Sequence, residues 1–305
     1  MALAHLRSGL HHGARGAPSG PPLPRPIPGR QDAQHLHSRS VRCHVLNPAT
    51  GAVQALPESP AAEHVNRVNL RDPYTFFALG RVSSTGDYKV LRMFNRLGFA
   101  KGGHQLFEVF TINGGDAHAR WRGQQSPGLF VDECSGVVVD GVVYFLTSRA
   151  YDGARYGIRA DYIVSFDLGR EEWRRDLRGP ISSKVGSASS YMRHHLTLAE
   201  LKGSLVLADR RHQPFTLDLW FLVDSESGHW VKEYHILTGP TISRPVLVDE
   251  SFKPLLLLDD GRLVVYVGTR GQLFIQDPGT DNFARVYMGL LDSVSVYTGN
   301  LLSGG

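Results

Sequence analysis

The chain is poor in cysteine and lacks any long apolar run, and these absences exclude several classes of protein. Only Cys43 and Cys134 occur among 305 residues, which is too few for a disulfide-stapled scaffold and favours a reducing compartment. No apolar run approaches the roughly 20 residues of a membrane-spanning helix. Asn-x-Ser/Thr glycosylation signals are also absent. We therefore expect a cytoplasmic or nuclear protein without a membrane partner, with organelle targeting by the N-terminal segment left open.

Motifs typical of enzymes are absent as well. The sequence contains no G-x-S-x-G, H-E-x-x-H, G-x-x-x-x-G-K-[ST] or Cys-x-x-Cys. The adjacent carboxylates Asp259 and Asp260 open a tight turn, which favours solvated residues over an acid–base pair. His194 and His195 would point to opposite faces of a strand, which argues against joint metal ligation. We expect a non-catalytic protein with no catalytic residue, no cofactor and no metal site.

Basic residues are almost all arginine. Six of the 33 basic residues are lysine, and the formal net charge at pH 7 is +4. Because no run of five or more Lys or Arg occurs, the charge permits acidic partners without indicating nucleic acid. We expect no nucleic-acid partner.

What the sequence does contain is a repeated pattern: an apolar strand, an Asp and, six residues later, an aromatic residue. Three copies are complete, and a related segment ends in a fourth aromatic. The aromatic residues are Trp121, Trp173, Trp230 and Phe283, at spacings of 52, 57 and 53 residues. Regular recurrence at this period indicates one supersecondary unit used repeatedly, and for all-β units it predicts propeller blades.

Each complete copy is preceded by a turn glycine between two apolar runs. These glycines are Gly141, Gly203 and Gly261. Glycine tolerates the positive φ of a tight turn, so each pair of runs predicts a β-hairpin. With the strand before the Asp and the strand that carries the aromatic, each unit predicts a four-stranded antiparallel blade. We expect the Asp to cap the last turn and the aromatic to pack between neighbouring blades.

The composition divides the chain into two expected parts. Residues 1–40 are rich in Pro, Gly, His and Arg, and their first acidic residue is Asp32. A segment of this composition cannot bury enough apolar surface to fold, so we expect a disordered tail. From Val41 onward the strand pattern is continuous. Residues 41–300 therefore predict an all-β, kelch-like, propeller-like array of blades whose first blade is incomplete.

Seven segments, in their order and spacing, resemble the associated domain of plant F-box proteins. They are NPATG…LP (47–57), ALGRVSSTGDYKVLRMF (78–94), VDGVVYFL (139–146), DYIVSFDLGREEW (161–173), LAELKGSLVLAD (198–209), TLDLWFLVDSESGHWVKEYHI (216–236) and DDGRLVVY (259–266). Each segment alone is a weak signal, but seven in order are specific.

This resemblance implies the substrate receptor of an SCF-type, cullin-RING ubiquitin ligase. In that family an N-terminal F-box docks onto a Skp-type adaptor, and the β-rich associated domain selects the protein to be ubiquitinated. Nothing before Val41 resembles an F-box, so we expect adaptor and cullin binding only if an F-box is supplied. The alternative is an F-box-less, kelch-like scaffold or competitor that binds targets without their ubiquitination. An enzyme is a third possibility, because propellers also host hydrolases and oxidases.

The connections after the turn-glycine strands are rich in arginine and aromatic residues. They span residues 95–104, 148–160, 209–215 and 268–271, and would emerge on one face of a propeller. Loops on a rigid scaffold usually carry binding, and Arg with aromatics is typical of interaction hot spots. We expect this face to bind an acidic or phosphorylated segment of a target protein. The competing interpretation is that an Arg-rich chain places Arg in every exposed loop. The candidate binding residues are Arg96, Lys101, Arg149, Tyr151, Arg155, Tyr156, Arg159, Arg210, Arg211, His212 and Arg270.

Overall fold

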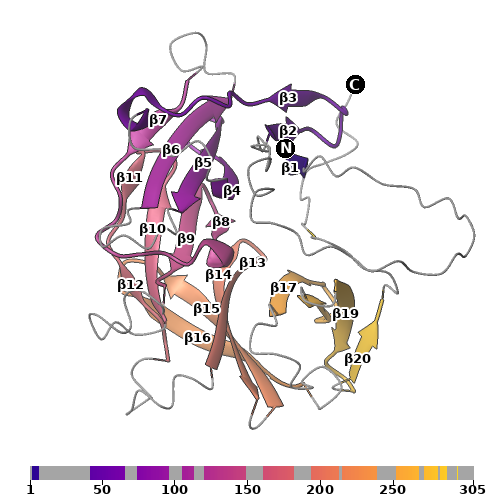
Figure 1. Cartoon of the computed structure of the whole chain (residues 1–305). Coiled ribbons are helices and arrows are strands. Elements are labelled where there is room, and N and C mark those ends of the chain that lie inside the picture. The colour runs from indigo at the N-terminus through magenta and orange to yellow at the C-terminus, as the bar shows by residue number, and fades with distance from the viewer. Residues whose placement is uncertain are drawn as a thin grey trace, which may run out of the picture.

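Strands dominate the structure and form consecutive antiparallel sheets (Figure 1). The computed structural model describes residues 2–6, 42–65, 74–95, 105–112, 120–148, 161–181, 194–212, 215–238, 252–267, 271–280, 282–286 and 294. Within these residues the helical elements are two 3-10 turns, η1 (Ala62–His64) and η2 (Glu133–Ser135). No helix in this part of the chain is long and apolar enough to cross a membrane. The all-β prediction is confirmed.

Four sheets follow one another as propeller blades, here called blades II to V. In each blade, consecutive strands pair antiparallel, and the inner strands β4, β8, β13 and β17 contact one another in chain order. Blade II comprises β4 (Tyr74–Arg81), β5 (Tyr88–Asn95), β6 (Gln105–Ile112) and β7 (Arg122–Gln124). Blade III comprises β8 (Val137–Val139), β9 (Val142–Leu146) and β10 (Tyr162–Asp167), with β11 (Glu172–Trp173) and β12 (Leu177–Arg178) sharing the outer position. Blade IV comprises β13 (His194–Leu201), β14 (Ser204–His212), β15 (Phe215–Asp224) and β16 (His229–Leu237). Blade V comprises β17 (Phe252–Leu257), β18 (Leu263–Val267), β19 (Gln272–Asp277) and β20 (Asn282–Arg285).

Blade I is a three-stranded sheet of β1 (Ala2–Leu6), β2 (Arg42–Leu46) and β3 (Val53–Ala55), and β1 contacts β4 of blade II. The β2–β3 hairpin turns as predicted at Asn47, whose N–H donates to Ala52 O at 2.8 Å. Residues 2–6 differ from the expected disordered tail, because they pair with β2 from Ala2 opposite Leu46 to Leu6 opposite Arg42. The remaining residues of that expected tail lie outside the described residues.

The first hairpin turns of blades III and IV have the backbone that the sequence predicts. Asp140 and Gly141 have φ values of 44° and 71°, and Lys202 and Gly203 have 51° and 78°. Two successive positive φ values belong to a type I′ turn, whose twist matches the flanking strands. At Gly141 the packing adds a second constraint, since a Cβ there would lie 2.9 Å from the backbone oxygen of Arg81.

The repeated Asp caps the outer turn in each complete copy, as predicted. Asp167 Oδ1 accepts from the backbone N–H of Gly169 at 2.8 Å. Asp224 Oδ1 accepts from Glu226 N–H at 2.9 Å, and Asp277 Oδ1 accepts from Gly279 N–H at 2.8 Å. The Asp therefore positions the turn, and its recurrence is structural.

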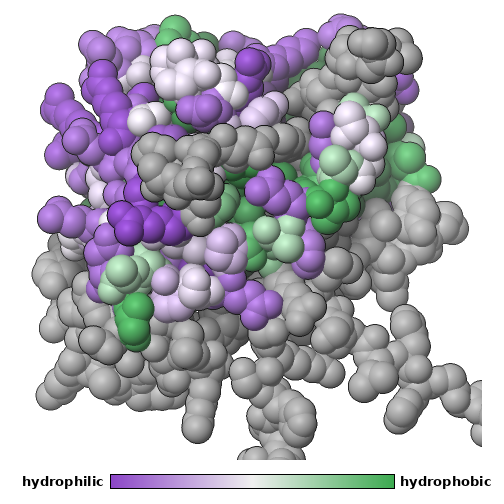
Figure 2. Space-filling model, turned by 90° about the horizontal axis from the view of Figure 1, so that it is seen from above, coloured by the Kyte–Doolittle hydropathy of each residue, from purple (hydrophilic) through white to green (hydrophobic). Residues whose placement is uncertain are grey.

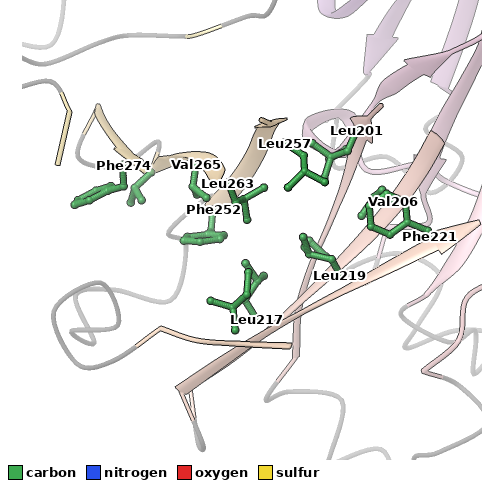
Figure 3. Close-up of a cluster of buried hydrophobic side chains, with 14 residues drawn as sticks. Leu201, Val206, Leu217, Leu219, Phe221, Phe252, Leu257, Leu263, Val265 and Phe274 are labelled. Atoms are coloured by element: carbon green, nitrogen blue, oxygen red, sulfur yellow. The ribbon is translucent and has the colours of Figure 1, made fainter. Parts of the chain in front are cut away.

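Among the described residues, the hydrophobic core consists of four clusters, one between each pair of successive blades. Figure 3 shows the cluster between blades IV and V, where Leu201, Leu217 and Leu219 face Phe252 and Val265. Hydrophilic residues make up much of the described surface in Figure 2, and hydrophobic residues gather near its middle. The four repeat aromatics each belong to, or pack against, the cluster shared with the preceding blade. Trp121 and Trp230 are buried, whereas Trp173 and Phe283 are half-buried.

The three tryptophans also make the same hydrogen bond to the preceding blade. Trp121 Nε1 donates to Pro57 O at 2.8 Å, Trp173 Nε1 to Gln125 O at 2.6 Å, and Trp230 Nε1 to Arg178 O at 2.9 Å. Each acceptor lies at or just after the outer strand of its blade. The indole thus combines apolar burial with one directed bond between blades, a use for which tryptophan is suited. Blade V has Phe283 at this position and makes no such bond.

A buried charged network joins blade II to the segment that follows blade I. Glu108 is 0% exposed and accepts hydrogen bonds from Arg92 Nε at 2.7 Å, from Ala61 N–H at 2.9 Å and from His64 Nδ1, whose separation is 2.9 Å. Arg92 also donates to Ser59 O at 2.7 Å, and its guanidinium lies 3.7 Å from the Trp121 ring centroid. Each charged side chain of the network therefore has hydrogen-bond partners, which a buried ion pair requires because an unpaired buried charge is costly.

A second charged network joins blades II and III at the outer turn of blade III. Glu171 accepts from Lys89 Nζ at 2.7 Å and from Arg122 Nε at 3.0 Å. Burial alone would raise the pKa of Glu171, but the hydrogen bonds from Arg122 and Lys89 outweigh it and the pKa is lowered. The carboxylate therefore remains ionised and holds the two blades together.

Candidate functional site

The four predicted binding connections occupy equivalent places in the blades. Each joins the second strand of its blade to the third: β5 to β6, β9 to β10, β14 to β15, and β18 to β19. In an antiparallel blade these connections lie at the strand ends opposite the two hairpin turns. We call the end of the blades at which each second strand ends and each third strand begins the connection face, and the opposite end, which carries the hairpin turns, the hairpin-turn face.

Most of the predicted binding residues lie outside the described residues, and their role stays a prediction. They are Arg96, Lys101, Arg149, Tyr151, Arg155, Tyr156, Arg159 and Arg270. Among the remaining three, His212 ends β14 and pairs with Phe215. The other two, Arg210 and Arg211, have described side chains.

The structure corrects the expected loop at 209–215. Strand β14 continues to His212, so residues 209–212 are strand and only 213 and 214 separate it from β15. Arg210 is 2% exposed, and its guanidinium lies 5.3 Å from the Phe252 ring centroid of blade V. Strand alternation explains this position, because Arg210 shares the face of Val206 and Ala208 that packs against blade V. Arg210 therefore contributes to packing between blades.

Arg211 points to the other face of blade IV, into a charged cluster that sequence reasoning missed. Its Nε lies 3.1 Å from Asp209 Oδ2, and its Nη2 lies 3.6 Å from Asp218 Oδ2. Asp218 also faces Lys232 Nζ at 3.5 Å and His235 Nδ1 at 2.5 Å. We call Asp209, Arg211, Asp218, Lys232 and His235 the blade IV cluster.

The blade IV cluster has a buried acidic floor and an exposed basic rim. The Asp209 and Asp218 side chains are 0% and 4% exposed, whereas those of Arg211, Lys232 and His235 are 35%, 39% and 54% exposed. Buried carboxylates are costly unless paired, so the two acids fix the positions of the Arg211, Lys232 and His235 side chains above them. The solvent-facing N–H groups can still donate to a carboxylate or phosphate of a partner. The described residues hold no group of three or more His, Cys, Asp or Glu arranged to bind a metal.

The cluster escaped prediction because it depends on strand register. Asp209 lies opposite Asp218 across β14 and β15, and Asp218 lies opposite His235 across β15 and β16. The sequence does not fix these pairings, since they depend on where the 213–214 connection begins. One signal was present: Asp218 stands at a buried position of an otherwise apolar strand, and buried Asp usually has a charged partner.

Comparisons with known proteins give the family. A model of the F-box associated beta propeller domain matches residues 32–288. An F-box protein of Arabidopsis thaliana, At5g10340, is 24% identical over 163 residues, and the alignment covers 53% of this chain and 34% of that protein. The chain thus matches about a third of the length of this curated relative.

Solved structures with similarity to the chain include two enzymes. A virginiamycin B lyase from Staphylococcus aureus has a TM-score of 0.40 at 10% identity, with 84% of this chain and 66% of that chain covered. An α-L-arabinanase from Penicillium chrysogenum has a TM-score of 0.49 at 14% identity, with 83% of this chain and 75% of that chain covered. Such low identity transfers no activity. With the family model matching most of its length, the chain belongs to the F-box associated beta propeller family.

Proposed function

We propose that this chain is the substrate-recognition part of an SCF-type ubiquitin ligase receptor, and that it is itself non-catalytic. The observation that carries the proposal is the family match over residues 32–288, within which the structure forms propeller blades. A propeller of this kind offers a rigid frame whose connections can bind a protein, and F-box associated domains serve as interaction modules. Cytoplasmic or nuclear localisation forms part of the proposal.

The proposed binding surface is the connection face. The basic residues predicted at 95–104, 148–160 and 268–271 support it, as do the solvent-accessible side chains of Arg211, Lys232 and His235 in the blade IV cluster. Arg suits this use because its planar guanidinium holds a carboxylate or phosphate through two parallel hydrogen bonds. The target segment is then acidic or phosphorylated.

Ubiquitination requires more than target binding. A Skp-type adaptor and a cullin join only through an F-box, whether it precedes this sequence in the complete protein or is supplied by fusion. The alternative function, a kelch-like scaffold or competitor, shares the target binding and lacks the ubiquitination. The two functions therefore differ in what happens to the bound target.

The experiment compares the chain with a version that carries a foreign F-box fused ahead of Met1. Both are used to co-precipitate proteins from plant extract, and the captured proteins are incubated with adaptor, cullin, ubiquitin and the conjugating enzymes. We expect both versions to capture the same targets and only the fused version to extend ubiquitin chains on them. Capture by both with no ubiquitination by either would favour the scaffold function, and capture by neither would overturn both.

A further inference from the structure

A groove of about 540 Å³ opens between blades III and IV, beside the outer turn of blade IV. Its volume falls within the range of about 300–1,000 Å³ that is usual for ligand sites. Polar side chains of blade III form its floor, and the β15–β16 turn forms its far wall. The principal lining residues are Tyr144, Ser165, Asp167, Arg174, Ser225 and Glu226.

The hydroxyl-bearing side chains Tyr144 and Ser165 line the floor of this groove. Tyr144 and Ser165 lie opposite each other on β9 and β10, and are 6% and 1% exposed. Burial raises the pKa of Tyr144, so its phenol keeps its proton and can donate. A bound group with acceptor oxygens would therefore find two hydroxyl donors on this floor.

The same positions between blades II and III show what such a site can hold. Lys89 and Tyr144 are each the third residue after a turn glycine with positive φ, and Thr111 and Ser165 are their partners across the strands. The residue after each outer Trp is an arginine, namely Arg122 in blade II and Arg174 in blade III. The two interfaces therefore present equivalent polar cradles.

Between blades II and III this cradle is filled by a carboxylate of the chain itself. Glu171, from the outer turn of blade III, accepts from Lys89 and from Arg122. Arg122 also donates to Thr111 Oγ1 at 2.9 Å, so each of the three side chains of the cradle, Lys89, Thr111 and Arg122, makes a hydrogen bond. The side chain that completes this site comes from the next blade.

Between blades III and IV the corresponding carboxylate is missing from the turn. Gly228 takes the place of Glu171: each lies two residues before its outer Trp, with φ values of 68° and 57°. A Cβ at Gly228 would meet nothing within 4 Å, so the position has room for a side chain. Between blades IV and V the equivalent residues, Val206 and Phe221, are apolar. The groove is thus the one polar cradle among these three described interfaces whose position two residues before the Trp holds no carboxylate, and Glu226 of the same turn lines its far wall instead.

We propose that this groove binds a carboxylate from outside the chain, supplied by an Asp or Glu side chain of an extended target segment. The proposal rests on the proposed function and adds a second contact, distinct from the connection face. The incoming carboxylate accepts from Tyr144 and Ser165, as Glu171 accepts from its own cradle.

The charged residues around the groove are compatible with this occupant. Asp167 is already engaged, because Arg174 holds its Oδ2 at 2.6 and 3.1 Å and two backbone N–H groups hold its Oδ1. Arg170 and Arg175 at the rim are balanced by Glu172 and Glu226. Selectivity therefore comes from the two hydroxyls on the floor, which favour an acceptor, rather than from net charge.

The test uses the whole chain and a fluorescein-labelled hexapeptide of alternating Glu and Gly, with a Gln-for-Glu peptide as the uncharged probe. Fluorescence anisotropy measures the affinity of wild type, Gly228→Glu and Gly228→Ala. The Gly228→Glu side chain should fill the groove from within, as Glu171 does in the other cradle. We expect it to weaken Glu-peptide binding by about tenfold, the effect of losing a charge-assisted hydrogen bond.

Gly228→Ala is the matched control, because it introduces the same backbone demand without a carboxylate, and it should bind as wild type does. The double variant Tyr144→Phe, Ser165→Ala should lose affinity to the same extent as Gly228→Glu. Equal binding of the Glu and Gln peptides, or undiminished binding by Gly228→Glu, would overturn the inference. Neither result touches the proposed function, which is tested separately by adaptor-dependent ubiquitination.

Discussion

At the scale of single residues, the indole N–H separates three of the repeat aromatics from the fourth. Replacing Trp230 by Phe reproduces the residue of blade V and removes the bond from Nε1 to Arg178 O. Because the hydrogen bond is lost and the smaller ring buries less apolar surface, we expect the free energy of unfolding to fall by about 1–2 kcal/mol. Urea denaturation measures the change, and Val231→Ala, at an exposed position of the same strand, should change it by less than about 0.5 kcal/mol. An unaltered midpoint for Trp230→Phe would show that the bond contributes no net stability.

Glu108 is the residue whose loss should cost most, because it is wholly buried and balances the charge of Arg92. Glu108→Gln keeps the size and leaves the Arg92 guanidinium without its counter-ion, so we expect a loss of about 3–5 kcal/mol. Guanidinium chloride denaturation gives the value, with the exposed Glu233→Gln as control. If Glu108→Gln lost no more than the control, the network would not stabilise the contact between blade II and the preceding segment.

At the scale of elements, the contact between blades II and III should depend on pH through Glu171. Its folded-state pKa lies below the ordinary value of 4.5, so its contribution is present above that pH and is lost as the pH falls through the folded-state pKa. Glu171→Gln should therefore cost about 1–2 kcal/mol at pH 7, with solvent screening allowed for, and less at pH 3. Urea denaturation at both pH values measures it, and an equal cost at both would assign the effect to packing.

The strands and turns also show which features of the fold could be predicted from the sequence. The turn glycines, the capping Asp and the outer aromatics could be predicted because each depends on residues close together in the chain. The blade IV cluster could not, since it needs the register that sets Asp209 opposite Asp218. The equivalence of Glu171 and Gly228 required the same knowledge, because the carboxylate and its cradle belong to different blades. The repeat pattern therefore predicts the blades, but it does not predict the contacts between neighbouring blades.

At the scale of the whole molecule, the two proposed binding sites are separate. The proposed groove lies between blades III and IV, beside the outer turn of blade IV. The connection face is proposed to bind through the basic residues predicted at 95–104, 148–160 and 268–271 and through the blade IV cluster. Binding variants must therefore spare the cluster: Arg211→Ala would leave Asp209 and Asp218 short of a counter-ion and destabilise the fold, so it does not test binding alone.

Arg155 and Arg159 lie outside the described residues and test the binding predicted for the connection at 148–160. We expect Arg155→Glu, Arg159→Glu to weaken target capture by about tenfold or more, because reversal replaces two charge-assisted hydrogen bonds by repulsion. Capture by wild type should also weaken between about 0.1 and 0.5 M salt, as screening shortens the reach of surface charges.

The matched control is Lys202→Glu, Arg120→Glu, at exposed positions of the hairpin-turn face with the same change in net charge. Co-precipitation at both salt concentrations measures capture, and the thermal transition checks the fold. An equal loss of capture in the control would show that only the net charge matters. Undiminished capture by the test variant would show that the two arginines do not bind the target.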